Sequence, residues 1–481
     1  MNVRSVVRMI GLLLVVEAGF MTTSIGWAIR DGDVDSLQHF IIASLITGLA
    51  GSVCFVVGRS APTMIRARDA LATVGIGWLL VGAFGAIPYL LEGALTHPAD
   101  AFFESASGFT TTGATVIRDV EILSRSLLWW RSLTQWMGGV GIVVLFIAVF
   151  PHLGVGASHL FRSETTGPIT ERLRPKLRHT SRLLWYIYVG LTGACATLLI
   201  VAGMEPFDAI CHAFTTLATG GFSTKNASIA AYSSISIELI ILLFMFLAGI
   251  NFGLYYRAAS GQPGELWRDA EFRTYTAVVV VATVLVTAAI LPQKETLGHA
   301  LRYSVFQVVS LQTATGHASD DFDRYPEFAR LLLLSLMFVG GSAGSTAGGI
   351  KVIRILVLGR ALVNQLVKSF QPSAVLAVRV GQAALDSGTV KSISVFFAAF
   401  LGVFLFGTLL LTMMGLDIIS AASAAVACQS NVGPGLGTVG PTKNFAAVPH
   451  AGKMILSFMM IAGRLEIMTV LALLVPAFWR R

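Results

Sequence analysis

The sequence predicts an all-α integral membrane protein of about ten spans, in which two N-terminal spans precede four repeated units. Three observations support this fold class. Hydrophobic residues make up 55% of the 481 residues and charged residues only 12%, about half the charged share of a soluble domain. Apolar runs of about 20 residues, long enough to cross a bilayer as a helix, recur along the chain. Short polar segments that contain glycine recur between these runs.

The apolar runs give the positions of the spans. The first run lacks a small-residue cleavage site, so we expect a retained helix rather than a signal peptide. We expect spans at residues 5–29, 37–58, 70–95, 126–150, 183–203, 234–256, 274–292, 329–358, 390–414 and 453–478.

The net charge of +8 follows membrane topology rather than a nucleic-acid surface. Basic residues concentrate in segments 59–68, 162–182 and 351–391, between expected spans. Because cytoplasmic loops carry an excess of Lys and Arg, we expect these segments in the cytoplasm, together with both termini. We therefore expect contact with membrane lipid and no nucleic-acid partner.

Four polar, glycine-containing segments divide the chain into repeats. Aligned on one glycine each, Gly113, Gly220, Gly316 and Gly433, they are 107, 96 and 117 residues apart (220−113, 316−220, 433−316). A pair of small residues follows each glycine in the next span. Two landmarks that recur four times in one order indicate an internal repeat. We expect two additional spans in residues 1–68 and pore repeats in residues 69–160, 161–265, 266–370 and 371–481.

An apolar stretch too short to cross the membrane precedes each polar segment. These stretches span 11 to 14 residues, at 100–110, 206–216, 297–310 and 417–428, a length that suits re-entrant helices. Irregular backbone at membrane depth must be buried in protein or line a watery cavity. Four such loops around one axis satisfy this condition, and their free carbonyls can replace the water shell of a cation. The repeats therefore predict one central pore with four filter loops.

Individually, each polar segment also fits an ordinary turn between helices, but their common order and spacing favour a pore. With these segments the sequence resembles the Trk/Ktr/HKT superfamily of potassium transporters, most closely the bacterial Trk-type pore subunit. The resemblance covers almost the whole chain and rests on residues 110–114, 218–222, 313–317, 430–437, 340–351 and 463–466.

The resemblance implies that each repeat contributes one filter strand that binds potassium. The implied potassium-binding residues are Thr111, Thr112, Gly113, Ala114, Ala218, Thr219, Gly220, Gly221, Ala314, Thr315, Gly316, His317, Asn431, Val432, Gly433 and Pro434.

One filter residue departs from the expected pattern. An aromatic or aliphatic side chain is expected after the third glycine, but His317 stands there. Its side chain either points behind the filter or forms a pH-sensitive external mouth, since histidine titrates near neutral pH. All four strands differ from T-V-G-Y-G, which leaves the degree of potassium-over-sodium selection open.

A glycine-rich run inside an expected span indicates a gate. Residues 340–349 contain five glycines among ten small residues, so a helix there should break or unwind, although close helix packing is an alternative. Arg464 lies near the middle of the last span, where a charge usually faces a cavity or a partner. The resemblance implies that both obstruct the pore. The implied gate residues are Gly340, Gly341, Ser342, Ala343, Gly344, Ser345, Thr346, Ala347, Gly348, Gly349 and Arg464.

No cofactor is expected in this chain, and potassium is expected as substrate at the filter residues, with no other metal. The G-x-G-x-x-G segment at Gly435–Gly440 lacks the preceding strand that nucleotide binding requires. No catalytic set such as paired aspartates or H-E-x-x-H lies in the spans, which disfavours an intramembrane enzyme.

The sequence and the resemblance together predict gated potassium uptake in the bacterial inner membrane. The resemblance implies a homodimer with one pore per protomer and a ring of cytosolic nucleotide-binding regulatory subunits. The basic segment 351–391 is a candidate docking surface for that ring. Proton- or sodium-coupled symport stays an alternative, because Glu17 lies in the first span.

Overall fold

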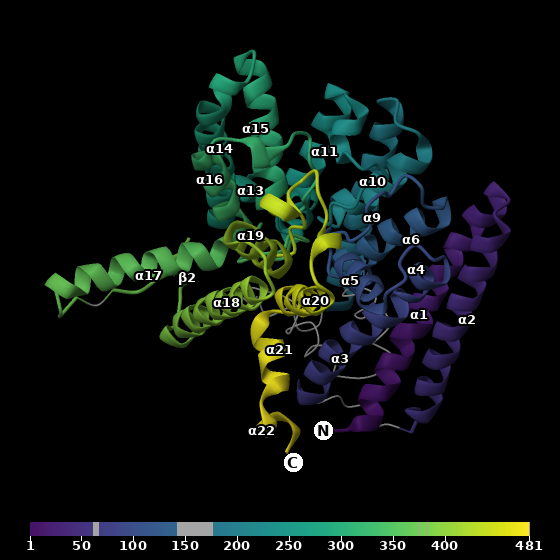
Figure 1. Ribbon diagram of the computed structural model, residues 1–481. Helices are drawn as coiled ribbons and strands as arrows, with labels where there is room; N and C mark the ends of the chain where they lie inside the picture. Colours follow the sequence, from purple (N-terminus) through teal and green to yellow (C-terminus); the bar gives the residue numbers. More distant parts are fainter. Residues whose placement is uncertain (61–66, 142–176, 375, 382, 481) are drawn as a thin grey trace.

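The computed structural model describes residues 1–60, 67–141, 177–374, 376–381 and 383–480, and it consists almost entirely of helices (Figure 1). Within these ranges the only sheet is a two-stranded hairpin, β1 (Arg379–Val380) with β2 (Ala383–Ala384). Six described helices are long and apolar enough to span a membrane, or eight if two bent pairs each count as one span. The all-α membrane fold class is confirmed.

The two N-terminal spans form a close pair, α1 (Val3–Asp31) and α2 (Val34–Val57). Asp33 caps α2 by accepting a hydrogen bond from the Ser36 N–H at 3.0 Å, which ends one helix and starts the next. Glycine brings the two backbones together, since a Cβ on Gly11 would lie 2.4 Å from the Phe55 nitrogen. α1 then packs on α3 and α6 of the first repeat.

The first two repeats each contain a span, a short helix and a second span. The first comprises α3 (Ala67–Gly85), α4 (Ile87–Leu91), α5 (Pro98–Phe109), α6 (Arg125–Trp136) and the π-helical turn η1 (Met137–Gly141). The second comprises α9 (Leu177–Val201), α10 (Pro206–Leu217), η3 (Ser228–Tyr232), α11 (Ile235–Ala248), α12 (Phe252–Ala259) and α13 (Gly264–Arg268).

The third and fourth repeats follow the same order. The third comprises α14 (Ala270–Ile290), η4 (Leu291–Gln293), α15 (Leu297–Gln312), η5 (Phe322–Arg324), α16 (Glu327–Phe338) and α17 (Val352–Phe370). The fourth comprises α18 (Ser387–Met413), α19 (Ile418–Gln429), η6 (Gly437–Val439), η7 (Phe445–Ala447), α20 (His450–Arg464), α21 (Ile467–Leu474) and α22 (Pro476–Trp479).

The second span of each repeat departs from a straight helix. α11 and α12 meet at 93°, and α20 and α21 meet at 118°. In the third repeat α16 ends at Phe338 and α17 begins at Val352, so the expected span 329–358 is interrupted by its glycine-rich run, as predicted. The expected span 126–150 begins as α6, and residues 142–150 lie outside the described part of the chain.

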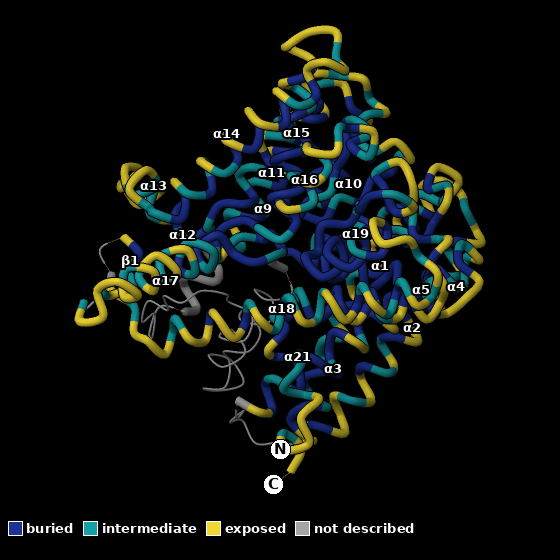
Figure 2. The backbone as a smooth tube through the Cα atoms, turned by 60° about the vertical axis from the view of Figure 1, so that its left-hand side comes forward, coloured by how far each residue is buried: buried dark blue, intermediate teal, exposed yellow. Residues whose placement is uncertain are grey.

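The short helices α5, α10 and α19 are buried over most of their length, and α15 over its C-terminal half. Figure 2 shows buried positions concentrated around α10 and α19, whereas α2 and α18 present exposed positions along much of their length. Exposed Leu, Val, Ile and Phe on these outer helices suit contact with lipid tails. Both termini lie on one side of the molecule (Figures 1 and 2), where Arg68 donates to the Arg480 carbonyl at 2.8 Å.

The predicted repeat boundaries stay a prediction. The boundary between residues 160 and 161 lies outside the described ranges. The boundary between 265 and 266 falls inside the short helix α13.

Candidate functional site

The four short helices α5, α10, α15 and α19 end in the same hydrogen-bonded cap. One residue of each cap has a positive φ: 54° at Thr111, 53° at Thr219, 56° at Ala314 and 56° at Asn431. The next N–H donates at 2.8 Å to a carbonyl one turn back, in the pairs Thr112–Ser107, Gly220–Thr215, Thr315–Ser310 and Val432–Ala427. This is the Schellman arrangement that commonly ends a helix. Its repetition at four non-glycine residues, for which the left-handed conformation is unfavourable, indicates a constraint common to all four repeats.

A glycine lies two residues after each of these left-handed residues, and the four glycines form a closed ring. Each has a positive φ and faces a carbonyl of the next strand so closely that a Cβ would collide with it. The fourth strand returns to the first, so the four segments surround one axis. The distances from an added Cβ to the oxygen are 2.1 Å for Gly113 to Gly220, 2.0 Å for Gly221 to Thr315, 2.0 Å for Gly316 to Val432 and 2.6 Å for Gly433 to Thr112.

The ring corrects the sequence alignment of the second segment by one residue. Gly221, and not Gly220, has the positive φ and faces the next strand. The equivalents of residues 111–114 are therefore 219–222 rather than 218–221, while the other two segments keep the expected register. In a Gly–Gly pair both residues tolerate the left-handed region, so spacing alone could not identify which one adopts it.

A cavity of about 130 Å³ borders the ring on the side of the loops that follow the strands. Four basic side chains also line it, Arg118, Arg131, Lys225 and Lys443. Carboxylates offset two of these charges at 3.7 Å, one from Asp208 and the other from Asp323. Of the expected filter residues, Gly113, Ala114, Gly221, Gly316, Gly433 and Pro434 line this cavity.

His317 lies behind its strand rather than in the cavity. Its side chain is 1% exposed, and its Nε2 lies 3.1 Å from the Thr216 hydroxyl of the second repeat. The Ser310 hydroxyl donates to the His317 carbonyl at 2.6 Å and so fixes the backbone there. Of the two interpretations of His317, the buried placement favours a side chain that points behind the filter.

The glycine-rich run is an irregular loop beneath the strands. Its two ends pair, with the Gly340 N–H donating to Ile350 at 2.9 Å. The loop also packs against the base of a short helix, since a Cβ on Gly348 would lie 2.1 Å from the Ser430 carbonyl. The Thr346 hydroxyl donates to the Leu217 carbonyl at 3.0 Å. The loop thus touches the ends of α10 and α19, directly below the ring.

Arg464 joins the loop to the first repeat. It donates to the Thr346 carbonyl at 2.9 Å and to the carbonyls of Gly138 and Gly139 at 2.5 and 2.8 Å. Its neighbour Gly463 packs on the end of α19, where a Cβ would lie 1.8 Å from the Gln429 carbonyl. The arginine and the loop predicted from the sequence as one gate therefore lie in direct contact.

Two carboxylates lie near the loop: Glu271, which the sequence analysis missed, and Glu466, which belongs to the segment 463–466 but was given no role in the gate. Glu271 of α14 accepts hydrogen bonds from the N–H group of Ala343 within the loop, at 2.7 Å, and from that of Ile353 in the first turn of α17, at 3.0 Å. Glu466, at the bend after α20, pairs with Arg354 at 2.6 Å. Both are acidic residues at the edges of apolar segments, which was the available signal.

The polar supports of the filter in the first repeat were missed as well. Glu104 of α5 and Arg131 of α6 form a buried ion pair at 2.7 Å, with side chains 0% and 3% exposed. Gln135, one turn further along α6, is also fully buried. Charged side chains within an apolar span are usually functional, so the presence of Arg131 in the expected span 126–150 could have identified this support.

One group of described residues has the spacing of metal ligands, namely His97, Asp100 and His450. The Lys453 ammonium lies 2.9 Å from the Asp100 carboxylate and already neutralises it. The rings of His97 and His450 are stacked at 3.7 Å, and the His97 Nδ1 already accepts a hydrogen bond from the Ala99 N–H at 3.1 Å. This arrangement suits a structural ion pair between α5 and α20 better than a metal site.

Comparisons with known proteins agree with this architecture. The TrkH family model, described as a cation transport protein, matches residues 36–481. The Trk system potassium uptake protein TrkH of Salmonella typhimurium is 39% identical over 488 residues and covers both chains completely. The Trk system potassium uptake protein TrkG of Escherichia coli is 34% identical and covers 92% of each chain. The crystal structure of the potassium transporter TrkH from Vibrio parahaemolyticus superposes with a TM-score of 0.90 at 38% identity, over the full length of both chains.

The chain belongs to the TrkH family of cation transport proteins. It is a multi-pass membrane transporter of the Trk type, which confirms the family expected from the sequence. Since this is a family of transporters, the alternative of an intramembrane enzyme is excluded.

Proposed function

We propose that this protein takes up potassium across the bacterial inner membrane through the ring of four filter strands. The closed cycle of carbonyls and glycines carries the proposal, because carbonyl oxygens can replace the hydration shell of a cation. The four short helices end at this ring, so the negative ends of their dipoles favour a cation there. The names of the relatives, potassium uptake proteins, support potassium as the ion.

The glycine-rich loop and Arg464 form the gate in this proposal. The loop lies beneath the ring, and the arginine ties it to carbonyls of the first repeat. A positive charge beside the path raises the energy of a passing cation. Opening therefore requires that the loop and the arginine move away together from the axis.

The regulatory proposal places a cytosolic nucleotide-binding ring on the basic segment 351–391, with two copies of this chain forming a dimer. α17 within that segment extends away from the other helices in Figure 1 and exposes Leu362, Leu366 and Phe370. An exposed apolar face on an extended helix suits a protein partner. A shift of α17 would reach the loop directly, since α17 begins at Val352.

Coupled symport is the alternative that the fold leaves open. Glu17 of α1 is 3% exposed, and neither carboxylate oxygen has a hydrogen-bond partner among the described residues. A buried acid without a partner is a candidate proton carrier. In a channel, potassium flux follows the potassium gradient alone, whereas a proton symporter moves potassium against its gradient when a proton gradient is imposed.

Rubidium uptake into proteoliposomes that contain the purified chain tests the proposal. We expect uptake down the gradient, competition by potassium stronger than by sodium, and no dependence on a proton gradient. Uptake absent from the wild type, even with a nucleotide-binding partner present, would contradict the proposed function. Uphill transport driven by protons would replace the channel with a symporter.

A further inference from the structure

The second filter strand, residues 219–222, and the residue after it, Ser223, are held by two side chains of the neighbouring repeat. The Gln135 amide nitrogen donates to the Gly220 carbonyl at 2.7 Å, and its amide oxygen accepts from the Phe222 N–H at 3.1 Å. Arg131, four residues earlier on the same face of α6, donates to the Ser223 carbonyl at 2.9 Å. Three backbone groups of this segment are thus fixed from a single helix.

Contacts with Glu104 and Phe222 hold the Arg131 side chain in the orientation that points it at the strand. Its Nε donates to Glu104 at 2.7 Å, and Glu104 also accepts from the Val116 N–H at 2.9 Å. The guanidinium lies over the Phe222 ring at 3.6 Å. The planar fork of arginine serves both the carboxylate and the Ser223 carbonyl in a fixed geometry. The first and second filter segments are therefore connected through one buried ion pair.

This support is asymmetric within the ring. The Gly220 carbonyl is the one that faces Gly113, and it is equivalent to the carbonyls of Thr112, Thr315 and Val432. Among the residues that the structure describes, those other three carbonyls accept no side-chain hydrogen bond. The fourth repeat also lacks a glutamine at the equivalent position. Gln135 lies three residues before Gly138, and the residue three before Gly463 is Met460.

We propose that Arg131 and Gln135 are positioning residues that fix the second filter strand and thereby set the preference of the ring for potassium over sodium. The inference rests on the proposed function. A carbonyl held by a donor in a close-packed wall cannot move inward to contact a smaller ion, and its second lone pair stays available to the permeating ion. If the donor is lost, the strand can adapt to sodium, because selective coordination requires ligands held by their surroundings.

Two variants test the inference. Gln135→Met has nearly the same volume and removes both hydrogen bonds. Arg131→Lys keeps the charge but replaces the planar fork, in which two different nitrogens reach Glu104 and the Ser223 carbonyl, by a single nitrogen. The matched control is Arg302→Lys, because Arg302 also pairs with a carboxylate, Glu238, at 2.6 Å and, within the described part of the chain, makes no hydrogen bond to a filter residue.

The measurement is the ratio of potassium to sodium permeability in proteoliposomes, with the melting temperature and the total flux recorded for each variant. We expect Gln135→Met to lower the ratio about tenfold, a change of about 1.4 kcal/mol, and Arg131→Lys to lower it by a smaller factor. Arg302→Lys should lower the melting temperature without changing the ratio.

Three outcomes decide the matter. A lower ratio in both variants with retained potassium flux supports the inference. An unchanged ratio, with or without a lower melting temperature, overturns it and leaves the two side chains a structural role. A wild type that conducts no potassium contradicts the proposed function instead, and the variants then have no ratio to compare.

Discussion

The filter ring and the glycine-rich loop are both shaped by glycine, but different forces hold them. In the ring each glycine contacts a carbonyl of the next strand, and each strand continues from a hydrogen-bonded helix cap. In the loop, side chains supply much of the anchoring: Glu271 and Arg464 from other helices, and Lys351, just after the loop, whose ammonium donates to the Ala347 carbonyl. Apart from the second strand, which Gln135 and Arg131 also hold, the ring is therefore fixed mainly by backbone geometry, and the loop mainly by polar side-chain contacts.

This difference indicates that the glycine-rich loop can move more easily than the filter ring. Displacing one strand of the ring disturbs two neighbouring strands and a helix end, because protein interiors are close-packed. Releasing the loop needs only the exchange of a few hydrogen bonds, each worth about 1 kcal/mol net. We therefore expect substitutions in the ring to change which ion passes, and substitutions around the loop to change how much passes.

The largest expected effect is in the ring, at Gly221→Ala. Its φ of 74° costs a non-glycine residue about 1–2 kcal/mol, and the added Cβ would lie 2.0 Å from the Thr315 carbonyl. We expect potassium-selective uptake to fall more than tenfold. Rubidium flux with sodium competition measures this.

The adjacent variant Gly220→Ala is the matched control. Its Cβ would lie 2.4 Å from the amide of the Gln135 side chain, so it disturbs the hydrogen bonds of that side chain but meets no backbone of the next strand. We expect a smaller loss than for Gly221→Ala. The reverse order would restore the sequence alignment that places Gly220 in the ring.

The next effect is at the loop, where Arg464→Ala should raise flux without the regulatory partner about tenfold or more. A unit charge about 5 Å from the path is worth about 3 kcal/mol at an effective dielectric constant of about 20. Rubidium uptake normalised to folded protein measures the rise. Arg464→Lys separates two causes: it keeps the charge, so low flux in Lys supports an electrostatic barrier. High flux in both variants supports the hydrogen bonds to the loop instead.

We expect Glu271→Ala to raise the flux less than Arg464→Ala does. The substitution leaves the N–H groups of Ala343 and Ile353 without their acceptor. Each unpaired group costs about 1–3 kcal/mol, so the loop should detach more often and its amides should exchange faster with deuterium. Glu271→Gln keeps an acceptor oxygen and should resemble the wild type. Equal exchange in the Ala variant and the wild type would show that Glu271 does not anchor the loop.

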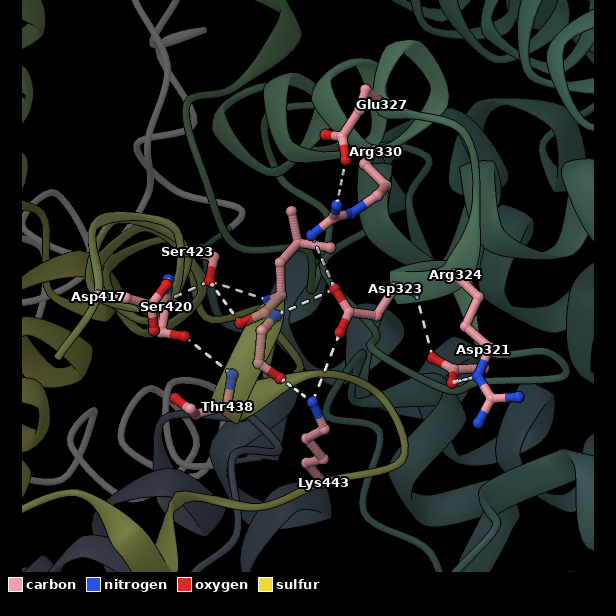
Figure 3. Close-up of polar contacts among 12 residues, drawn as sticks. Asp321, Asp323, Arg324, Glu327, Arg330, Asp417, Ser420, Ser423, Thr438 and Lys443 are labelled. Atoms are coloured by element: carbon pink, nitrogen blue, oxygen red, sulfur yellow. Dashed lines mark hydrogen bonds and ion pairs between the residues drawn. The ribbon is translucent and has the colours of Figure 1, made fainter.

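The smallest effect on transport is expected outside both regions, at Asp323 (Figure 3). Its carboxylate accepts from Arg330 at 3.1 Å and from the Gly437 N–H at 3.0 Å, so it joins a loop of the third repeat to a loop of the fourth. Asp323→Ala should destabilise the protein by about 1–3 kcal/mol and leave the potassium-to-sodium ratio unchanged.

Glu327→Ala is its control, because Glu327 binds the same Arg330 but is 85% exposed. We expect a loss below about 1 kcal/mol. Thermal unfolding in detergent compares the two variants. A changed ion ratio in Asp323→Ala would extend the filter support to these loops.

Much of the architecture follows from the sequence because it depends on local patterns. Apolar runs predicted the long helices, and short apolar stretches predicted α5, α10, α15 and α19. The glycine-rich run 340–349 predicted the break between α16 and α17. Arg464 was identifiable because a lone charge inside an apolar span rarely lacks a role. These features need only composition and spacing within about 30 residues.

The register of the ring and its supports were decided by the tertiary structure. Gly220 and Gly221 are equivalent by propensity, and contact with Thr315, 94 residues away from Gly221 (315−221), selects between them. Gln135 reaches Gly220 across 85 residues, and Arg464 reaches Gly138 across 326. Each of these contacts forms only after separate repeats have assembled around one axis. Local sequence determined where the backbone could turn, and packing between repeats determined which atoms face the path of the ion.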